Sequence, residues 1–592
     1  MLFVLRNSNP AREYRKKIWG GRKKSSTIRL FNPGESWSSS GFDDGVPLSH
    51  SPGYSLRTYP YPPIYSKGNL VNNDFAHSAT SLTRWLKIRA TPPSLQDNTA
   101  DLDRLRRAVV EVVGNRPLLI PFNRTAKVAL RFRRAGFTGF AVINDLGTTF
   151  ELVDFVGGNA PVRVGVALDL GTTHLEATLI DLGDGRQLAH ANRENGQIPF
   201  GADVLSRVHR ADEPGGAAVL HQEVILSING LIATLAKDGG ISAGEIRALS
   251  VSGNPVMTHF LLALETAQLI REPYIPSANL IDPCHGADLG LVIHPSAPVW
   301  IMPGVGSYFG GDLISGIIAS GLHQEEQVCM LIDVGTNAEV VVGCRDWLIA
   351  CAGAAGPALE GGVARMGMRA GAGAIEHVEI EPGSGEISYT TIHSEKPRGI
   401  CGSGIIDLVA ALYLARIIDI RGKFRPACGH PRLLSTGEDL AFMVATPEEA
   451  ADGRPVLFGQ IDLDAVMRSK AAMYSILTTL VNQVGVAFGD LHKIYVAGAF
   501  GRHISPRQAI VLGMLPDLPL TTFVPVGNSS LAGAERALLD RGARDACRSI
   551  IRQITYLELN VNQEFMIRFS GSRFIPHTDH TLFPSVPFYN QD

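Results

Sequence analysis

Cysteine is scarce in this sequence, and the first 283 residues have none. Seven cysteines occur in 592 residues, beginning with Cys284. The two closest, Cys344 and Cys351, have six residues between them, which is no standard spacing for metal ligands. So few thiols, odd in number, argue against a disulfide framework and favour reduced side chains in a cytoplasmic protein. The C-x4-C-x2-C pattern of a plant-type iron–sulfur cluster is also absent.

Long apolar runs and an excess of charge of one sign are absent as well. No uninterrupted run of 18 or more apolar residues occurs, so no membrane span is expected. The formal net charge of −3 gives no general reason to expect binding to nucleic acid or to a membrane. With 45% hydrophobic and 19% charged residues, the composition is that of a globular protein, and 592 residues suggest three or four domains.

Sustained periodicity is missing from residues 1–91, which are rich in Ser, Pro, Tyr and Asn. The first thirty residues contain nine Arg or Lys and one Glu. This basic start lacks the apolar core of a secretory signal. A targeting peptide, a frame-shifted leader and a disordered tail are all open, and we expect an irregular or disordered extension over this range.

A small α/β domain is expected over residues 92–160. Its first element is a helix, because four apolar residues follow the spacing of one helix face: Leu102, Leu105, Val109 and Val113. Strands are then expected over residues 118–120, 128–132, 139–143 and 150–156.

A glycine-threonine turn joins two apolar strands in VGVALDLGTTHLEATLIDL, residues 164–182. Gly171 lets the backbone approach an anion, and Thr172 and Thr173 offer hydroxyl and amide donors. Asp169, at the end of the first strand, can hold a hydrated divalent cation. This turn is therefore a candidate phosphate loop.

The letters DLGTT also occur earlier, at residues 145–149. Two copies so close together cannot both be the same loop of one nucleotide site. We favour the copy at Asp169, because a continuing strand follows it, whereas the earlier copy soon reaches Gly157 and Gly158.

The pattern of the candidate loop returns. Residues 328–343, VCMLIDVGTNAEVVVG, again place an acid, Asp333, before a turn made of Gly335, Thr336 and Asn337. A third glycine-rich element follows a strand, at Gly498, Ala499, Phe500 and Gly501. Asp169, Asp333 and Gly498 are separated by 164 and 165 residues. We therefore expect two similar lobes, about 162–325 and 326–592, that clamp one nucleotide.

Other candidates lie between these loops. Asp312, in a small-residue helix expected over residues 304–322, is a candidate to orient water or to belong to a metal shell, with a polar helix cap as the alternative. Glu360 lies in a stretch almost devoid of large side chains and is a candidate for ribose or metal contact. Residues 253–254 and 402–404 each precede a helix whose free amides would suit an anion, although the first is equally a tight turn.

Two later helices complete the expected pattern. A long helix is expected over residues 462–488, before the strand that leads to Gly498. Residues 527–531 are expected to cap another helix, which passes through Ala534 and Leu538.

The ordered trio D-x-G-T-T, D-x-G-T-N and A-G-A-F-G resembles the superfamily of sugar and acetate kinases, heat-shock ATPases and actin. Four further segments narrow the resemblance to the reductive activators of corrinoid proteins: residues 253–258, 356–362, 399–404 and 556–586. These proteins use ATP to help return an inactive cobalt(II) corrinoid to cobalt(I). The resemblance covers about residue 92 to the C-terminus. It implies an α/β fold: a two-lobed actin-like, sugar-kinase-like (ribonuclease H-like) ATPase after a small middle domain.

The resemblance also implies a site and partners. ATP with Mg²⁺ would lie between the lobes, with Asp169 and Asp333 acting on the metal through water and Asp312 as a third catalytic acid. Nucleotide contacts would come from Gly171, Thr172, Thr173, Gly335, Thr336, Asn337, Glu360, Gly498, Ala499, Phe500 and Gly501. The partner would be a corrinoid protein.

The family usually carries an iron–sulfur domain, and its ligands are missing here. That domain is therefore absent from this chain or lost through a misassigned start, which implies a separate ferredoxin-like electron donor. A homodimer is left open. Two alternatives are a small-molecule kinase of the same fold and a non-hydrolysing nucleotide-binding regulatory protein.

Overall fold

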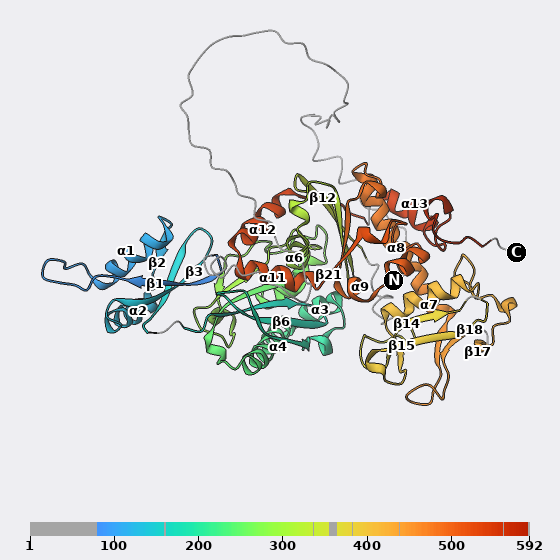
Figure 1. Cartoon of the computed structure of the whole chain (residues 1–592), viewed down its shortest axis with the longest axis horizontal. Helices are drawn as coiled ribbons and strands as arrows, with labels where there is room; N and C mark the ends of the chain where they lie inside the picture. Colours follow the sequence, from blue (N-terminus) through green and yellow to red (C-terminus); the bar gives the residue numbers. More distant parts are fainter. Residues whose placement is uncertain are drawn as a thin grey trace, which may run out of the picture. The chain divides into compact units, whose positions relative to one another are not determined.

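The computed structural model describes residues 80–158, 161–335, 337–353, 364–381, 383–436, 439–559 and 562–589 (Figure 1). Their strands form one four-stranded, two six-stranded and two three-stranded sheets. Most of the N-terminal range expected to be irregular lies outside the described residues. Its last part is described, and there the expectation was wrong, because Thr83–Arg89 is strand β1. Leu86 and Ile88 are buried on it, while Lys87 and Arg89 are exposed, an alternation too short to stand out in the sequence.

The four-stranded sheet has the order β1-β3-β4-β2. Its other elements are α1 (Asp101–Val113), β2 (Leu118–Leu119), α2 (Phe122–Arg134), β3 (Thr138–Asp145) and β4 (Phe150–Val156). The strand predicted over residues 128–132 was wrong, since this segment lies in α2. Val128 and Phe132, four residues apart, are buried, whereas Leu130 is 49% exposed. That spacing is the helical period, and a strand would have put all three side chains on one face.

The first six-stranded sheet has the order β7-β6-β5-β8-β10-β9. Its strands are β5 (Val164–Leu170), β6 (His174–Asp181), β7 (Gln187–Glu194), β8 (Ile246–Gly253), β9 (Cys284–His285) and β10 (Pro298–Ile301). Strands β5, β6 and β7 form an antiparallel meander, and β8 and β10 then add in parallel on the other side of β5.

The second six-stranded sheet repeats this plan, in the order β21-β20-β11-β12-β13-β22. Its strands are β11 (Cys329–Val334), β12 (Ala338–Cys344), β13 (Trp347–Gly353), β20 (Lys493–Ala497), β21 (Phe523–Gly527) and β22 (Ile554–Tyr556). Strands β11, β12 and β13 form the antiparallel meander, and β20 and β21 add in parallel beside β11. The repeat seen in the sequence is therefore a repeat of topology, which confirms the two-lobed actin-like, sugar-kinase-like α/β fold.

Three helices share a core with both of these sheets: α6 (Gly311–Ser320), α11 (Ser529–Leu539) and α12 (Arg541–Gln553). Figure 1 shows α6 and α11 side by side, and the contact between them is close. A Cβ atom on Gly533 would lie 2.4 Å from Cα of Ser315, so only glycine fits at this crossing. The crossing holds the first turns of α6 and α11 near the ends of β5 and β11.

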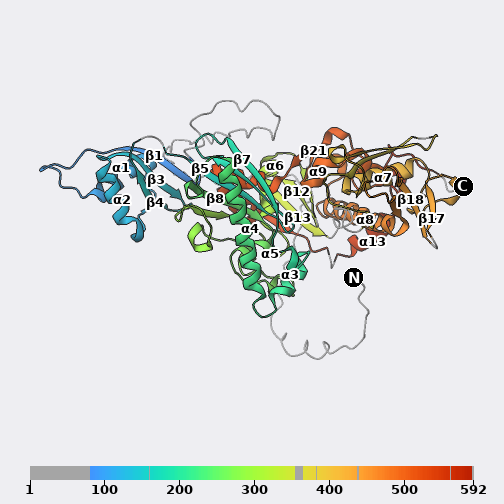
Figure 2. The same cartoon turned by 90° about the horizontal axis from the view of Figure 1, so that it is seen from below.

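Helices α3 (Val204–Ala211), α4 (Gly216–Asp238) and α5 (Pro255–Leu261) pack on the first sheet. Figure 2 shows α4 along this sheet, where it contacts β6 and β7. Among the described helices, α4 is the one long and apolar enough to cross a membrane. Its apolar residues Leu220, Val224, Ile228 and Leu231 are buried in the core of this sheet, which accounts for its composition.

The second lobe also contains helices α7 (Gly402–Leu414), α8 (Gln460–Gln483), α9 (Gly498–His503), α10 (Pro506–Leu512) and α13 (Gln563–Gly571). Helices α8 and α9 pack on the six-stranded sheet, whereas α7 packs on β14, α10 on α7 and α13 on α8. The first three-stranded sheet contains β14 (Ala374–Ile380), β15 (Ile387–Thr391) and β16 (Gly399–Ile400). The other contains β17 (Leu433–Thr436), β18 (Asp439–Ala445) and β19 (Val456–Gly459).

Two predicted helices were too long. The segment 304–322 is helical only from Gly311 to Ser320, because Gly310 before it is extended (φ −88°, ψ −173°) and Gly321 after it has φ +75°. The helix expected over residues 462–488 ends at Gln483, and Gly485 follows it with φ +67°. A glycine in this conformation is a common helix stop.

Candidate functional site

Two β-hairpins of the same design each carry a pair of opposed acids. Asp169 of β5 lies directly opposite Glu176 of β6. Asp333 of β11 lies directly opposite Glu339 of β12. Opposite residues of antiparallel strands project from the same face, about 5 Å apart, and like charges there repel. Each hairpin therefore presents a negative pair that a cation would stabilise.

The start of α11 contacts both hairpins. Asn528, just before the helix, donates from Nδ2 to Oδ2 of Asp169 (2.9 Å) and to Oε2 of Glu176 (2.7 Å). Ser530 Oγ donates to Oδ1 of Asp169 (2.6 Å), and Ser529 Oγ donates to Oδ2 of Asp333 (3.4 Å). Three consecutive residues thus bring the acids of the two lobes together at the positive end of one helix.

The surroundings of Asp169, Asp333 and Glu339 disfavour the charged forms of these three carboxyl groups. Burial raises the pKa of Asp169 to about 6, with further contributions from Asp312 and Glu176. Burial, followed by the neighbouring acid Asp169, raises the pKa of Asp333 to about 6. For Glu339, burial comes first and the charges of Asp312 and Asp333 add to it, so its pKa lies well above the usual value.

Asp312 completes the cluster from the first turn of α6, where its Oδ1 accepts from the backbone amide of Leu313 (2.9 Å). Burial, then the charge of Asp333, raises the pKa of Asp312 to about 6. The sequence left a catalytic acid and a polar cap as alternatives for this residue. The structure places it beside the acids of the second hairpin, and both interpretations stay predictions.

A cavity of about 370 Å³ opens beside Asp333. The first hairpin lines it with Thr173 and His174. The second lobe lines it with Asp333, Val334, Gly335, Arg369, Ala370, Glu376, Ile392, Cys401, Gly402, Ser403, Gly498, His503 and Ile504. Residues from all three predicted loops therefore meet at one cavity, which is large enough to hold a small ligand.

Glycine is required at two of these loops. Gly498 has φ +72°, and a Cβ atom there would lie 3.0 Å from Oδ1 of Asp333. A Cβ atom on Gly171 would lie 2.3 Å from the carbonyl oxygen of His174. Side chains at either position would displace the acid or the turn next to the cavity.

Three other predicted residues, Thr172, Asn337 and Gly501, are not among the described residues that line the cavity. Thr172 Oγ1 accepts from Nδ2 of Asn254 (2.9 Å). Asn337 is exposed, and its carbonyl oxygen accepts from the amide of Gly335 (2.9 Å). A Cβ atom on Gly501 would lie 2.1 Å from the carbonyl oxygen of Val496, so this glycine packs α9 on its sheet. Four predictions concern residues whose placement or side chains lie outside the described part: Thr336, Glu360, Ala499 and Phe500.

The two helix starts proposed for anion binding differ. Asn254 caps α5 itself, since its Oδ1 accepts from the amide of Met257 (3.0 Å). Gly402 and Ser403, at the start of α7, line the cavity instead. Only the second start is thus positioned to offer amides to a ligand there.

The earlier DLGTT copy turns between β3 and β4 in the four-stranded sheet. Arg116 NH2 donates to Oδ1 of Asp145 (2.8 Å), and Arg541 NH1 lies 3.6 Å from its Oδ2. Asp145 is therefore neutralised by arginines, one of them on α12.

Sequence reasoning missed five residues of the acidic cluster and its contacts: Glu176, Glu339, Asn528, Ser529 and Ser530. The two glutamates had a signal, since DLGTTHLE and DVGTNAE each place a Glu on the return strand. The α11 residues were seen only as a helix cap, because their contacts with Asp169 span about 360 residues.

Replacing Asn528 by Ala should lower the free energy of unfolding by about 2–3 kcal/mol, because it removes a helix cap and two hydrogen bonds to acids. Urea denaturation measures this cost. Asn562→Ala is a matched control, since Asn562 caps α13 by accepting from the amide of Phe565 (3.1 Å). It should cost about 1 kcal/mol. Equal costs would contradict the stabilising link from α11 to the acids.

Comparison with known proteins agrees with this geometry. Residues 327–587 match the family model described as the C-terminal domain of RACo, the ASKHA domain. Residues 164–325 match the model described as the RACo middle region. Neither model extends over residues 92–160, which contain α1, α2 and three strands of the four-stranded sheet. The model described as the middle region matches the first lobe instead, so the assignment of residues 92–160 as the middle domain stays a prediction.

Individual relatives point the same way. The chain is 31% identical over 479 residues to the corrinoid activation enzyme RamQ of Eubacterium limosum, covering 79% of both chains. It is 24% identical over 423 residues to the Co(II) methylated amine-specific corrinoid protein reductase of Methanosarcina barkeri, covering 66% of this chain and 73% of the relative. A solved structure of a reductive activator for corrinoid, iron–sulfur protein matches with a TM-score of 0.79 and 37% identity, covering 88% of this chain and 82% of that one.

Proposed function

Because this chain belongs to the family of reductive activators of corrinoid proteins, we propose that it binds and hydrolyses ATP to drive reduction of a corrinoid protein. The cobalt(II) of the partner would accept one electron and become cobalt(I). A separate one-electron donor, such as a ferredoxin-like protein, would be oxidised in the same step. ATP and water would give ADP and phosphate.

The single observation that carries this proposal is the meeting of the three glycine loops at one cavity. Thr173, Asp333 and Gly498, separated by more than 300 residues in the sequence, all belong to this region. We place the phosphates against the Thr172–Thr173 turn, Gly335 and the start of α7. The nucleoside would lie beside Gly498, where Val334, Ile392 and Ile504 offer apolar contacts.

We propose that the acidic cluster holds Mg²⁺. Asp169 and Asp333 both accept hydrogen bonds from serines at the start of α11, and each has a Glu opposite on its hairpin. Mg²⁺ is usually held by one or two carboxylates together with waters and substrate phosphates. Bound in this way, Mg²⁺ would neutralise charge on the phosphates. We therefore assign Asp169 and Asp333 to hold it through water.

Hydrolysis would need no covalent nucleophile. Asp312 is the acid that we assign to orient the attacking water, because it lies beside the charge of Asp333 and has a pKa of about 6. A group of this pKa is largely ionised at neutral pH and can accept a proton. Lobe positions would differ between the ATP and ADP states, and this difference can be coupled to a partner that binds one state more tightly.

Phosphate release and cobalt absorbance together test the proposed function. The chain is incubated with Mg-ATP alone and with a corrinoid protein in its cobalt(II) state plus a reduced ferredoxin. We expect cobalt(I) to form only when the chain and ATP are both present, and phosphate release to rise when the partner is added. Turnover only with a small hydroxyl or carboxylate substrate would indicate a kinase instead. Absence of turnover in every mixture would indicate a non-hydrolysing binding protein.

A further inference from the structure

An ion pair connects the two lobes at the edge of the cavity. Arg369, from the second lobe, places NH1 at 3.4 Å from Oε1 of Glu194, the last residue of β7 in the first lobe. Both side chains are more than half exposed, at 54% for Arg369 and 71% for Glu194. The pair is therefore a contact that a ligand can reach and replace.

The same pair borders the proposed nucleotide site. Arg369 lines the cavity itself. Glu194 lies directly opposite His174 on the neighbouring strand, and His174 lines the cavity immediately after the Thr172–Thr173 turn. Burial, followed by the positive charge of Arg369, lowers the pKa of His174.

Arg369 carries a positive charge in a cavity whose other described charged residues are acidic. Among the described residues that line the cavity, Arg369 is the one Arg or Lys, whereas Asp333 and Glu376 are acidic. The acids around Asp169 and Asp312 add further negative charge nearby. A triphosphate entering this cavity needs a positive partner, and the planar, forked guanidinium matches phosphate oxygens better than any other side chain.

We propose that Arg369 is a phosphate-binding residue that Glu194 holds in the absence of nucleotide and that ATP draws away from Glu194. This inference rests on the proposed ATP site and adds a competition to it. The carboxylate of Glu194 and the phosphates of ATP claim the same guanidinium. Glu194 therefore lowers the affinity for ATP, and nucleotide binding breaks one connection between the lobes.

Two substitutions with opposite expected effects test the proposal. Arg369→Gln should raise the Kd for Mg-ATP about 10- to 100-fold, the usual effect of losing a charge-assisted contact. Glu194→Gln should lower the Kd about 2- to 5-fold, because it releases Arg369 from an exposed ion pair. In the double variant the gain from Glu194→Gln should disappear. Isothermal titration with Mg-ATP measures all three, and thermal melting shows that each variant is folded.

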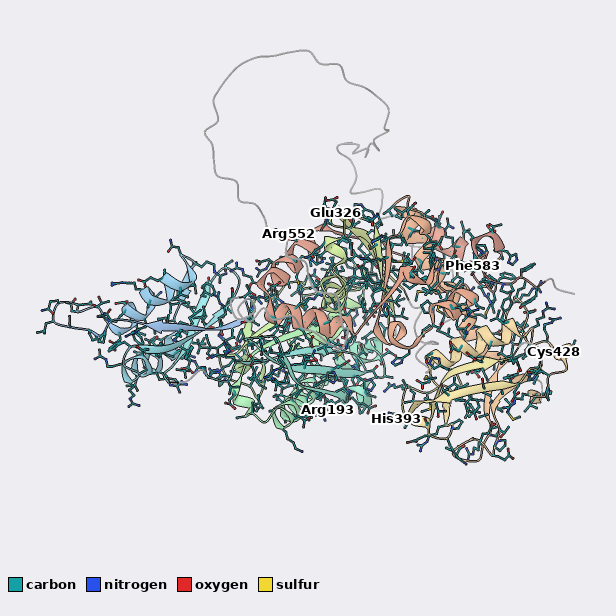
Figure 3. All side chains as sticks on the ribbon, in the orientation of Figure 1. Arg193, Glu326, His393, Cys428, Arg552 and Phe583 are labelled. Carbon is teal, nitrogen blue, oxygen red and sulfur yellow. The ribbon has the colours of Figure 1, made fainter. Side chains whose placement is uncertain are left out.

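A second exposed Arg–Glu pair provides the matched control. Arg345 NH1 lies 2.7 Å from Oε1 of Glu326, with exposures of 54% and 78% close to those of the tested pair. Glu326, labelled in Figure 3, and Arg345 are not among the residues that line the cavity. Arg345→Gln and Glu326→Gln should leave the Kd for Mg-ATP unchanged.

The possible failures can be told apart. If the unmodified chain takes up no ATP, the proposed function and this inference both fall. If the unmodified chain binds ATP and Arg369→Gln binds equally well, or if Glu194→Gln weakens binding, this inference is overturned and the proposed function stands. A shift in the control variants equal to that in Arg369→Gln would also overturn it, since the effect would then follow from net charge alone.

Discussion

Replacing Asp333 by Asn is expected to slow ATP hydrolysis about 10²- to 10³-fold, the usual effect of removing one group that stabilises a charged transition state. Asp333 lines the cavity and faces Glu339 across its hairpin. Asn is nearly the same size, but it cannot supply the negative charge that we assign to holding Mg²⁺. The turnover number at saturating Mg-ATP measures the effect.

Asp333 is a cleaner site for this experiment than Asp169. Among the described residues, Asp333 accepts one long hydrogen bond, 3.4 Å from Ser529, whereas Asp169 accepts two shorter ones from α11. Asp333→Asn should therefore melt within a few degrees of the unmodified chain. Asp184→Asn, in an exposed turn of the first lobe, removes the same charge away from the cavity and should keep full turnover. Equal turnover in the two variants would show that Asp333 does not take part in hydrolysis.

Much of the fold was open to prediction because its repeat is written in local patterns. The strand–acid–glycine–strand order at Asp169 and again at Asp333 predicts two hairpins, and each became the centre of a six-stranded sheet. Prediction failed where local patterns were short or ambiguous. Leu86 and Ile88 give only two alternating buried positions in β1, and the apolar residues of α2 fit a strand until burial shows which of them share a face.

The site was less predictable than the fold, because its contacts join distant parts of the chain. A tight turn that requires glycine can be recognised from the glycine itself, so Gly171 and Gly498 were found from the sequence. The partners of Asp169 on α11 were not, since a serine or asparagine at a helix start is usually only a cap. The link between Arg369 and Glu194 has no local signal at all, because it depends on how the two lobes meet.

The crowding of acids around Asp312 predicts that this residue destabilises the nucleotide-free protein. Asp312→Asn should raise the melting temperature by about 2–4 °C at pH 8 and slow ATP hydrolysis about 10²-fold. Asn keeps an oxygen that can accept from the amide of Leu313, but it removes a charge that burial and Asp333 disfavour. A substitution that raises stability and lowers activity is expected where a functional site holds carboxylates that repel one another.

The increase in melting temperature on replacing Asp312 should depend on pH, and the direction of this dependence is a separate test. The pKa of Asp312 is about 6 in the folded chain, against about 4 when unfolded. The folded chain thus holds its proton over a range where the unfolded chain has lost it, and stability falls as pH rises through that range. The melting temperatures of Asp312→Asn and the unmodified chain should coincide below about pH 4 and separate fully above about pH 6.

Mg²⁺ and nucleotide should reduce the difference in melting temperature between Asp312→Asn and the unmodified chain, because they stabilise the unmodified chain more. If a cation held by this cluster offsets the repulsion among its carboxylates, saturating Mg-ATP should raise the melting temperature of the unmodified chain more than that of Asp312→Asn at pH 8. Asp184→Asn, which removes a charge from an exposed turn, should respond like the unmodified chain. A variant Asp312→Asn that melts below the unmodified chain at pH 8 would mean that this carboxylate is a structural acceptor for α6, and the repulsion argument would fail with it.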